Sequence, residues 1–229
     1  MIALYIMSFS SKILVIIPAR AGSKRIKGKN TKYFNGFTLI EHSIKYAQNH
    51  IDGDIIISTD DKQIESIAEQ YNVPILWRNE SLAQDQTPTT DVVKDVIERV
   101  EKSYDFVVLL QPTNPLRPKK MFKEAIKLLE EKKSDSLITV SLSKHKLGKI
   151  NHSAFKPYTY EFGQRSQGLE PLYYENGLLY VCSYELAKNG KLMSENPTAM
   201  LIEHPYGSVD IDTELDWKWA ELISKEYND

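Results

Sequence analysis

ILVIIPARAGSKRIKGKN, residues 13–30, joins an apolar run to a basic loop. The run ends at Pro18, and its unbroken β-branched and leucine residues predict a strand buried on both faces, as in a parallel sheet. The loop that follows carries five cations and two glycines: Arg20, Lys24, Arg25, Lys27, Lys29, Gly22 and Gly28. Because glycine lets the backbone approach a ligand and Lys and Arg neutralise phosphate, the loop predicts a polyanion cradle. A solvated basic loop is the alternative.

The basic loop does not match the common phosphate-binding patterns. Gly22 and Gly28 are further apart than G-x4-G-K-[ST] allows, and Asn30 stands where that pattern has Ser or Thr. No G-x-G-x-x-G follows a predicted strand, which argues against a dinucleotide fold. The sequence also lacks H-x3-H, C-x2-C and G-x-S-x-G, so we expect neither a zinc site nor a serine hydrolase.

Length and composition indicate one soluble domain, alone or with a small appended lobe. The 229 residues include 29 basic and 31 acidic side chains, giving a net charge of −2 and no nucleic-acid footprint. The single cysteine, Cys182, excludes an internal disulfide and fits a reducing compartment. No run is long enough to span a membrane, and the short apolar start MIALYIM is a poor secretory signal. We therefore expect a cytoplasmic protein with no membrane partner, and a disordered or strand-like extension at its start.

Short apolar runs alternate with segments of helical periodicity along most of the chain. Strands are predicted at residues 13–17, 55–57, 74–77, 106–110, 137–140 and 178–181, and helices at 39–48, 62–71, 89–101, 119–132 and 214–227. Polar residues at 58–61, Thr89 or Thr90, and the Thr213–Asp216 pair are candidate helix caps. This alternation predicts a three-layer α/β/α fold with a mostly parallel sheet.

The pattern breaks between residues 141 and 177, which are rich in Lys, Tyr, Gly and Ser. We interpret this segment as an inserted lobe or oligomerisation arm, with residues 1–140 and 178–229 forming the core. Ligands of parallel α/β sheets bind beyond the carboxyl ends of the strands. That rule places the basic loop, residues 58–61 and residues 111–115 (QPTNP) on one rim, with Gln111 available to a ligand. A rigid turn in which Gln111 bonds to backbone is the equally weighted alternative for the last block.

A pair of aspartates near the C-terminus is a candidate metal site. Alternate residues of an extended segment face the same side, so Asp210 and Asp212 in SVDID would present two carboxylates together. Such hard oxygen ligands, with room for water and phosphate oxygens, suit Mg²⁺. A capping Asp212 with a solvated Asp210 is the equally weighted alternative.

Taken together, the blocks IIPARAGSKRIKGKN, IISTDD, LLQPTNPLR and SVDIDTELDW resemble the acylneuraminate cytidylyltransferases, which activate nine-carbon keto sugar acids (nonulosonic acids). The resemblance covers residues 13 to the last helix and implies a nucleotidyltransferase fold whose inserted lobe dimerises and reaches into the partner's site. It implies CTP and a nonulosonic acid as substrates, Mg²⁺ on Asp210 and Asp212, and a homodimer. Residues implied at the nucleotide are Ala19, Arg20, Gly22, Ser23, Lys24, Lys29, Asn30, Arg78, Thr89 and Thr90. Those implied at the sugar are Gln111, Lys149, Arg165 and Asn176.

The family resemblance also implies a mechanism. The anomeric hydroxyl of the sugar acid would attack the α-phosphorus of CTP, and pyrophosphate would leave. Arg20 and Lys29 would offset the charge on the leaving group, Asp210 and Asp212 would hold the metal, and Arg25 and Lys27 would stay solvated. No protein base is evident, so a metal-activated hydroxyl is our expectation.

The chain departs from the family pattern in the lobe that would face the sugar. Tyr174 and Glu175 precede Asn176 where sialic-acid members often have R-P, and residues 165–171 replace the usual R-Q-x-L-P. The acceptor is therefore expected to be N-acetylneuraminate, or a legionaminic, pseudaminic or deaminated nonulosonic acid. A Kdo cytidylyltransferase and a D-x-D glycosyltransferase are the alternative functions.

Overall fold

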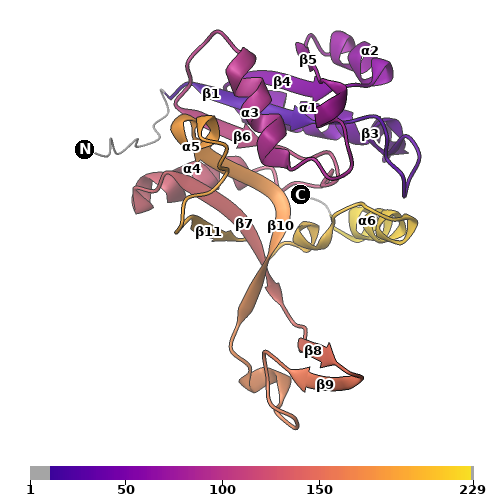
Figure 1. Ribbon diagram of the computed structural model, residues 1–229, viewed down its shortest axis with the longest axis vertical. Coiled ribbons are helices and arrows are strands. Elements are labelled where there is room, and N and C mark those ends of the chain that lie inside the picture. Colours follow the sequence, from indigo (N-terminus) through magenta and orange to yellow (C-terminus); the bar gives the residue numbers. More distant parts are fainter. Residues whose placement is uncertain (1–10, 228–229) are drawn as a thin grey trace.

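A computed structural model describes residues 11–227, and a seven-stranded sheet forms its centre (Figure 1). The order across the sheet is β11-β7-β10-β6-β1-β4-β5. The strands are β1 (Ile13–Pro18), β4 (Asp54–Thr59), β5 (Ile75–Trp77), β6 (Phe106–Leu109), β7 (Ser136–Ser143), β10 (Leu172–Ser183) and β11 (Thr198–Leu201). All neighbours pair in parallel except β10, which is antiparallel to β6 and β7. The prediction of a mostly parallel sheet is confirmed.

The helices form a layer on each face of the sheet, which confirms the three-layer prediction (Figure 1). They are α1 (Leu39–His50), α2 (Lys62–Gln70), α3 (Thr89–Arg99), α4 (Met121–Lys132), α5 (Tyr184–Lys188) and α6 (Glu214–Glu226). Residues of α1, α2 and α4 pack with Val15 and Ile17 of β1, whereas α3 and α5 pack with Leu14 and Ile16. This double burial is why the β1 sequence is apolar without alternation.

The last helix, α6, packs against the basic loop after β1 rather than on the sheet layers. A separate apolar cluster joins Ile26 of that loop to Val209 and Ile211 of the segment before α6, and to Trp217 of α6 itself. The loop also contains the short 3-10 helix η1 (Lys29–Thr31) and precedes the hairpin of β2 (Tyr33–Phe34) and β3 (Phe37–Thr38). This cluster holds two segments that are far apart in sequence against each other.

Local capping explains where most helices begin. Capping boxes form at Thr38 and, as predicted, at Thr213, while the Asp61 side chain accepts from the backbone of Gln63 at the start of α2. The predicted cap of α3 is wrong. The helix begins at Thr89 after Pro88, and no side chain caps it, because Thr89 already lies in its first turn.

A long arm extends from the core where residues 141–177 break the helix and strand alternation (Figure 1). Strands β7 and β10 run out of the sheet together and carry a hairpin of β8 (Gly148–Asn151) and β9 (Ala154–Pro157) at their far end, with the short 3-10 helix η3 (Ser166–Gly168). The core strands β7 and β10 therefore continue across residues 140 and 178. Our expectation for the first seven residues lies outside the part of the chain described.

The buried guanidinium of Arg117 links the arm strand β10 to the core. It donates to the Leu178 carbonyl at 2.9 Å, the Gln111 carbonyl at 2.7 Å and the Ser43 hydroxyl at 3.2 Å. Burial lowers the pKa of Arg117 to about 10, so the side chain remains charged at neutral pH.

Replacing Arg117 with Met is expected to lower the free energy of unfolding by about 3 kcal/mol, because buried acceptors lose a charged donor. Chemical denaturation measures this loss. The surface variant Arg99→Met, whose parent ion-pairs with Asp95, should cost less than about 1 kcal/mol. Equal losses for the two variants would contradict the structural role of Arg117.

Candidate active site

The basic loop is fixed at the carboxyl ends of β1 and β4. The Ala19 backbone donates to Ser58 at 2.9 Å, and the Ala21 backbone donates to the Asp60 carboxylate at 2.8 Å. The Asn30 amide closes the loop by donating to the Arg20 carbonyl at 3.0 Å. These hydrogen bonds hold the loop at the rim, in addition to its apolar contact with α6 through Ile26.

Loop cations and two carboxylates surround a cavity of about 270 Å³ beside this rim. Arg20 pairs with Asp85 at 2.6 Å, and Lys24 pairs with the other oxygen of the same carboxylate. Across the cavity, Lys29 donates to the Asp212 carboxylate and to the Ile211 carbonyl, both at 2.8 Å. Ser23 also lines the cavity, and Gly22 lies beside it, with its carbonyl accepting from Arg20 at 3.0 Å. The structure therefore brings together the predicted phosphate-binding residues of the loop.

Arg25 is largely exposed, as expected, and it also makes a contact that the sequence did not predict. Its guanidinium donates to Asp212 at 2.9 Å. The packing of Ile26 against Ile211 explains the pairing, since it brings the loop to the segment that carries Asp212. Lys27 is exposed and makes no ion pair or hydrogen bond with residues 11–227, as expected.

Asp85 is a counter-ion that sequence reasoning missed. The hydrogen bonds and charges of Lys24 and Arg20 hold the pKa of the Asp85 carboxyl below its ordinary value. Asp85 follows the short 3-10 helix η2 (Glu80–Leu82) in a loop without a recognisable motif, and only tertiary contacts bring it to the cations.

Replacing Asp85 with Asn is expected to tighten metal-free CTP binding about three- to fivefold, because Arg20 and Lys24 would no longer exchange a carboxylate for phosphate. Isothermal titration without metal measures the change. Asp52→Asn, which removes an exposed carboxylate at the opposite edge of the sheet, is the matched control. Weaker binding by Asp85→Asn would instead mean that Asp85 preorganises the cations.

Buried and exposed side chains alternate along residues 209–212, as predicted, although this segment does not form a strand. Val209 and Ile211 are buried at 1% and 0% exposure, while Asp210 is exposed and Asp212 half-buried. Desolvation raises the pKa of Asp210, and the charge of Asp212 adds to this, although a hydrogen bond from Thr113 opposes it. Desolvation works against ionisation of Asp212 as well, yet Lys29 and Arg25 lower its pKa.

This carboxylate pair suits a divalent cation. The charge of Asp212 raises the cost of ionising Asp210, and a divalent cation such as Mg²⁺ would stabilise both carboxylates. Within residues 11–227 no group of three or more His, Cys, Asp or Glu side chains forms a metal cluster.

The other predicted nucleotide residues border the same rim. Arg78 is buried and directs its guanidinium to the Ser58 hydroxyl at 3.2 Å and carbonyl at 2.8 Å, so it ties β5 to β4. Burial lowers the pKa of Arg78, while the charge of Asp60 raises it. Thr89 and Thr90 form the first turn of α3 and are partly exposed. Their contact with a nucleotide stays a prediction.

The block of residues 111–115 fixes the base of the arm. The Asn114 amide is fully buried and donates to the Val209 carbonyl at 2.8 Å and the Asn176 carbonyl at 3.0 Å. It thus connects the residue before Asp210 to the start of a bulge in β10. Sequence analysis missed this role of Asn114, because a buried asparagine has no signal in an apolar pattern. Gln111 is partly exposed, and its side chain makes no hydrogen bond with the described residues.

Asn176 lies beneath the rim rather than on it. Its side chain is 4% exposed, accepts from the Thr139 hydroxyl at 2.7 Å and donates to the Ser141 hydroxyl at 3.0 Å. These contacts give Asn176 a structural role in shaping β10. The predicted contact with a sugar is untested.

Lys149 and Arg165 are not brought to the rim of their own chain. Lys149 lies in β8 with its ammonium 4.9 Å from the Tyr158 ring, and Arg165 precedes η3 at the far end of the arm (Figure 1). Both are exposed. Tyr174, at the position where family members often have Arg, donates to the Gly207 carbonyl at 3.2 Å and so anchors the arm.

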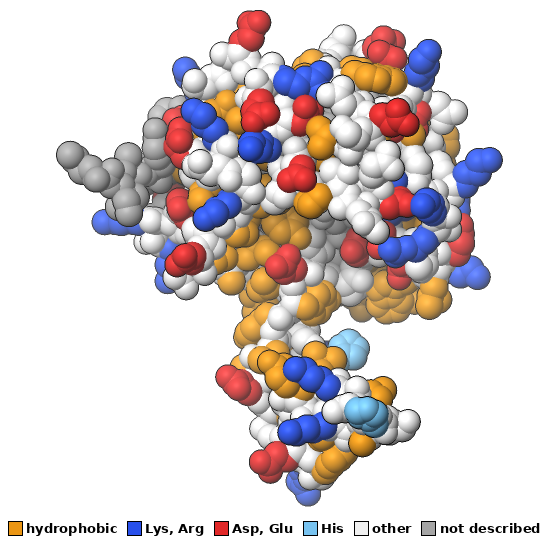
Figure 2. Space-filling model, in the orientation of Figure 1, with side chains coloured by type: hydrophobic (Ala, Val, Ile, Leu, Met, Phe, Trp, Pro, Cys, Tyr) orange, Lys and Arg blue, Asp and Glu red, His pale blue; other side chains and the backbone are white. Residues whose placement is uncertain are grey.

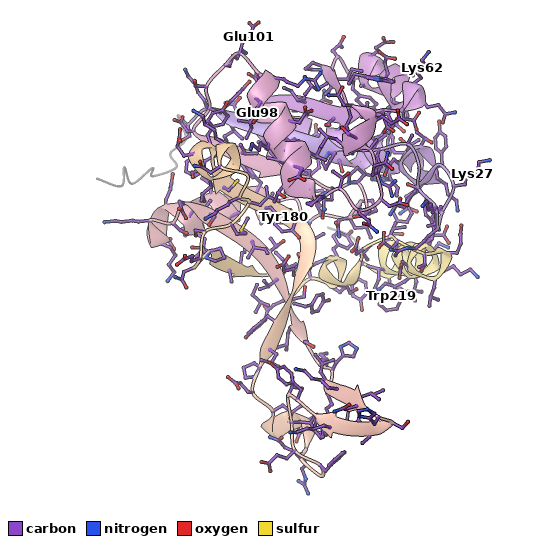
Figure 3. The ribbon with its side chains drawn as sticks, in the orientation of Figure 1. Lys27, Lys62, Glu98, Glu101, Tyr180 and Trp219 are labelled. Carbon is purple, nitrogen blue, oxygen red and sulfur yellow. The ribbon has the colours of Figure 1, made fainter. Side chains whose placement is uncertain are left out.

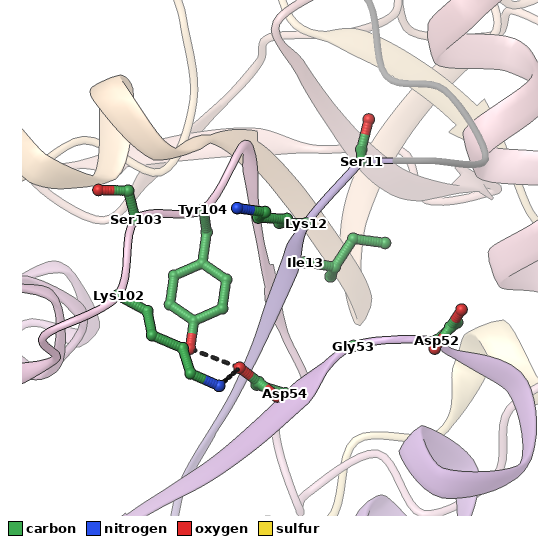
Figure 4. Close-up of a pocket in the computed structure, with 9 residues that line it drawn as sticks. All are labelled: Ser11, Lys12, Ile13, Asp52, Gly53, Asp54, Lys102, Ser103 and Tyr104. Carbon is green, nitrogen blue, oxygen red and sulfur yellow. Dashed lines mark hydrogen bonds and ion pairs between the residues drawn. The ribbon is translucent and has the colours of Figure 1, made fainter.

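A larger cavity of about 720 Å³ lies at the opposite, amino-terminal edge of β1 and β4 (Figure 4). None of the predicted site residues lines it. Three of its polar side chains bond to one another, since Lys102 at 2.9 Å and Tyr104 at 2.8 Å both donate to Asp54. We therefore interpret it as a structural network.

The Asp54 network predicts a pH dependence of stability. The hydrogen bond from Lys102, followed by that from Tyr104, lowers the pKa of Asp54. The Asp54 carboxylate therefore contributes to the free energy of unfolding at pH values above its unfolded-state pKa. This contribution is lost as the pH falls through the lower folded-state pKa. Asp54→Asn should destabilise the protein at neutral pH by less than about 1 kcal/mol and by nothing near pH 2. Thermal melts across this range test it; a loss that does not change with pH would contradict it, and Asp52→Asn serves as control.

Comparison with solved structures shows the fold. A CMP:2-keto-3-deoxy-manno-octonic acid synthetase complexed with CTP aligns with a TM-score of 0.69 at 16% identity, over 95% of this chain and 100% of that one. A 4-diphosphocytidyl-2C-methyl-D-erythritol synthase from Anaerococcus prevotii aligns at 0.66 and 17% identity, over 94% and 96%. The fold is that of the nucleotidyltransferases.

Sequence comparison then identifies the family. The family described as Cytidylyltransferase matches residues 14–214, and the chain belongs to it. The CMP-N,N′-diacetyllegionaminic acid synthase of Legionella pneumophila is 34% identical, over 93% of this chain and 96% of its own length. The pseudaminic acid cytidylyltransferase of Campylobacter jejuni is 29% identical over 93% and 97%. The N-acylneuraminate cytidylyltransferase of Streptococcus agalactiae is 31% identical over 90% of this chain, which spans 52% of that relative.

Proposed function

We propose that this enzyme joins CTP to a nonulosonic acid and gives a CMP-sugar and pyrophosphate. The observation that carries the proposal is the double contact of Lys29 with Asp212 and Ile211, because it puts the cationic loop directly against the carboxylate pair. Relatives that act on legionaminic, pseudaminic and neuraminic acids support a nine-carbon acceptor. They favour it over the eight-carbon acid of the Kdo alternative, and family membership favours nucleotidyl transfer over the glycosyltransferase alternative.

In this mechanism the anomeric hydroxyl of the sugar gives its proton to solvent as its oxygen forms a bond to the α-phosphorus. The bond between the α-phosphorus and the α–β bridging oxygen breaks, and pyrophosphate leaves with that oxygen. Arg20 and Lys24 release the Asp85 carboxylate and bind the terminal phosphates of CTP instead. Lys29 offsets the charge that develops on the departing pyrophosphate. Glycine at position 22 allows the backbone to lie close to the triphosphate. The chain's own contribution is therefore positioning and charge neutralisation.

Asp210 and Asp212 would hold Mg²⁺, which would supply Lewis-acid polarisation to the reaction. The chain's own residues prepare this site: Lys29 keeps Asp212 ionised and in place, while the Asn114 amide fixes the backbone next to Asp210.

A pyrophosphate-release assay tests the function. The enzyme is incubated with CTP, Mg²⁺ and, in turn, N-acetylneuraminate, N,N′-diacetyllegionaminate, pseudaminate, a deaminated nonulosonate and Kdo. We expect release with at least one nonulosonic acid and little with Kdo. No release with any nine-carbon acid would refute the proposal.

No helix among the described residues is long and apolar enough to cross a membrane. We keep the predicted cytoplasmic location as part of this proposal.

We further propose that two copies of the chain associate through the arm. The arm exposes large apolar side chains among charged ones (Figure 2): Ile150 of the hairpin is 77% exposed, and Tyr158 and Phe162, which follow the hairpin, are each 72% exposed. A two-stranded hairpin is marginally stable alone, so a partner surface would stabilise it. Association would also let Lys149 and Arg165 act at the partner's rim, where a sugar carboxylate needs cations.

Sedimentation analysis tests the association. Ile150→Asp and Phe162→Asp should shift a dimer to monomer, while Leu215→Asp, which charges an exposed leucine outside the arm, should leave it dimeric. A wild-type monomer at micromolar concentration would refute this part of the proposal without affecting the chemistry.

A further inference from the structure

The base of the arm carries a carboxylate, that of Glu175, which belongs neither to the phosphate-binding loop nor to the Asp210–Asp212 pair. Glu175 is exposed on β10 and pairs with no cation of residues 11–227. Its carboxylate accepts instead from the Tyr180 hydroxyl at 3.4 Å. The other carboxylate oxygen, Oε1, makes no hydrogen bond with residues 11–227.

A bulge in β10 creates this arrangement. Glu175 pairs with Val140 of β7 and Tyr180 pairs with Ile138. Between these two pairs β10 advances five residues while β7 advances only two. The extra residues are held by the buried Asn176 amide and by Gly177, whose φ of 76° and close approach to the Asn114 side chain leave no room for a Cβ. The bulge thus folds Glu175 back towards Tyr180.

The bulge also puts Glu175 next to the proposed reaction centre. Asn114 donates to the carbonyls of Asn176 and Val209, which are the neighbours of Glu175 and Asp210 respectively. Tyr180 pairs across strands with Leu109, two residues before Gln111. Figure 3 labels Tyr180 on the stretch of β10 between α3 and the start of the arm. Burial, then the charge of Glu175, raises the pKa of Tyr180 to about 12, and Asp210 adds to the shift.

The charges here decide which part of a sugar acid can face Glu175. Glu175, Asp210 and Asp212 would repel the sugar carboxylate, so an uncharged part of the acceptor must lie against Glu175. A carboxylate accepts hydrogen bonds and cannot donate, and the Tyr180 hydroxyl already occupies one of its oxygens. Its other oxygen can accept from a donor on the acceptor sugar, and an acylamino N–H is a donor carried by the acids that relatives of this chain are named for, N,N′-diacetyllegionaminic acid and N-acylneuraminate.

Resting on the proposed function, we infer that Glu175 is a specificity-determining residue that accepts a hydrogen bond from the N–H of an acylamino group on the acceptor sugar. The tyrosine orients the carboxylate, and the bulge sets its height above the rim. The side chain selects acceptors and takes no part in phosphoryl transfer.

Steady-state kinetics of Glu175→Ala and Glu175→Gln tests the inference, with N-acetylneuraminate, N,N′-diacetyllegionaminate and a deaminated nonulosonate as acceptors. Glu175→Ala should raise KM for the acylamino acceptors about tenfold or more, and for the deaminated acid less than about threefold. Both kcat and KM for CTP should stay within about twofold of the wild type. Glu175→Gln should give an intermediate preference, because it retains an uncharged acceptor.

Two further variants separate recognition from stability. Tyr180→Phe should reduce the preference for acylamino acceptors less than Glu175→Ala does, and Glu101→Ala, an exposed glutamate at the far edge (Figure 3), should change nothing. Equal losses for all acceptors, or a raised KM for CTP, would overturn the inference. If the wild type is active and Glu175→Ala keeps its preference, only the inference fails. Wild-type inactivity with every acid would refute the proposed function itself.

Discussion

Replacing Lys29 with Ala should lower kcat/KM for CTP about a hundredfold or more. The side chain is only 11% exposed and forms the contact between the phosphate loop and Asp212. Its loss removes a preorganised charge worth about 3 kcal/mol in the transition state and releases the Ile211 carbonyl. Calorimetry should therefore show weaker CTP binding as well as slow pyrophosphate release.

Lys27→Ala is the matched control for Lys29→Ala. It removes the same charge from the same loop, yet Lys27 points into solvent (Figure 3) and contacts no carboxylate among residues 11–227. Its kinetics should stay within about twofold of the wild type, since an exposed unpaired charge contributes little. Equal effects of the two variants would mean that the loop acts by total charge, and the assigned cradle would then be wrong.

Replacing Asp212 with Asn should nearly abolish turnover in Mg²⁺ while leaving the fold intact. The expected loss is again about a hundredfold or more, since one hard oxygen ligand is lost. Nucleotide binding without metal should hold or improve, because Lys29 and Arg25 lose their internal counter-ion. Opposite changes in metal-free affinity and in turnover would not arise from simple unfolding.

Pyrophosphate release and metal-free calorimetry on the same preparation measure both changes caused by Asp212→Asn. Glu203→Gln, which neutralises an exposed carboxylate on the approach to the same segment, should behave like the wild type. Turnover by Asp212→Asn at the wild-type rate would remove the metal assignment.

The elements that hydrophobic periodicity defines could be predicted from the sequence. β1 is recognisable because both of its faces are buried, and the start of α6 because Thr213 and Asp216 form a capping box. The hairpin of β8 and β9 was not foreseen. Its residues are almost all exposed, so no alternation of apolar and polar side chains marks it.

At the site, the sequence revealed charges and missed most of their partners. Lys29, Asp210 and Asp212 belong to recognisable motifs, whereas Asp85 and Asn114 act through contacts between segments distant in sequence. Arg25 differs from Lys27 only because Ile26 packs inward and brings Arg25 over Asp212. Such distinctions depend on tertiary packing, which local patterns do not contain.

The carboxylates that already lie in the cavity affect how CTP binding depends on ionic strength. Arg20 and Lys24 pair with Asp85, and Arg25 and Lys29 pair with Asp212, so two of the four positive charges are cancelled before any nucleotide arrives. Binding then replaces one set of negative oxygens with another, and fewer dissolved ions need to leave. CTP affinity should therefore depend on added salt less steeply than the number of basic residues in the loop suggests.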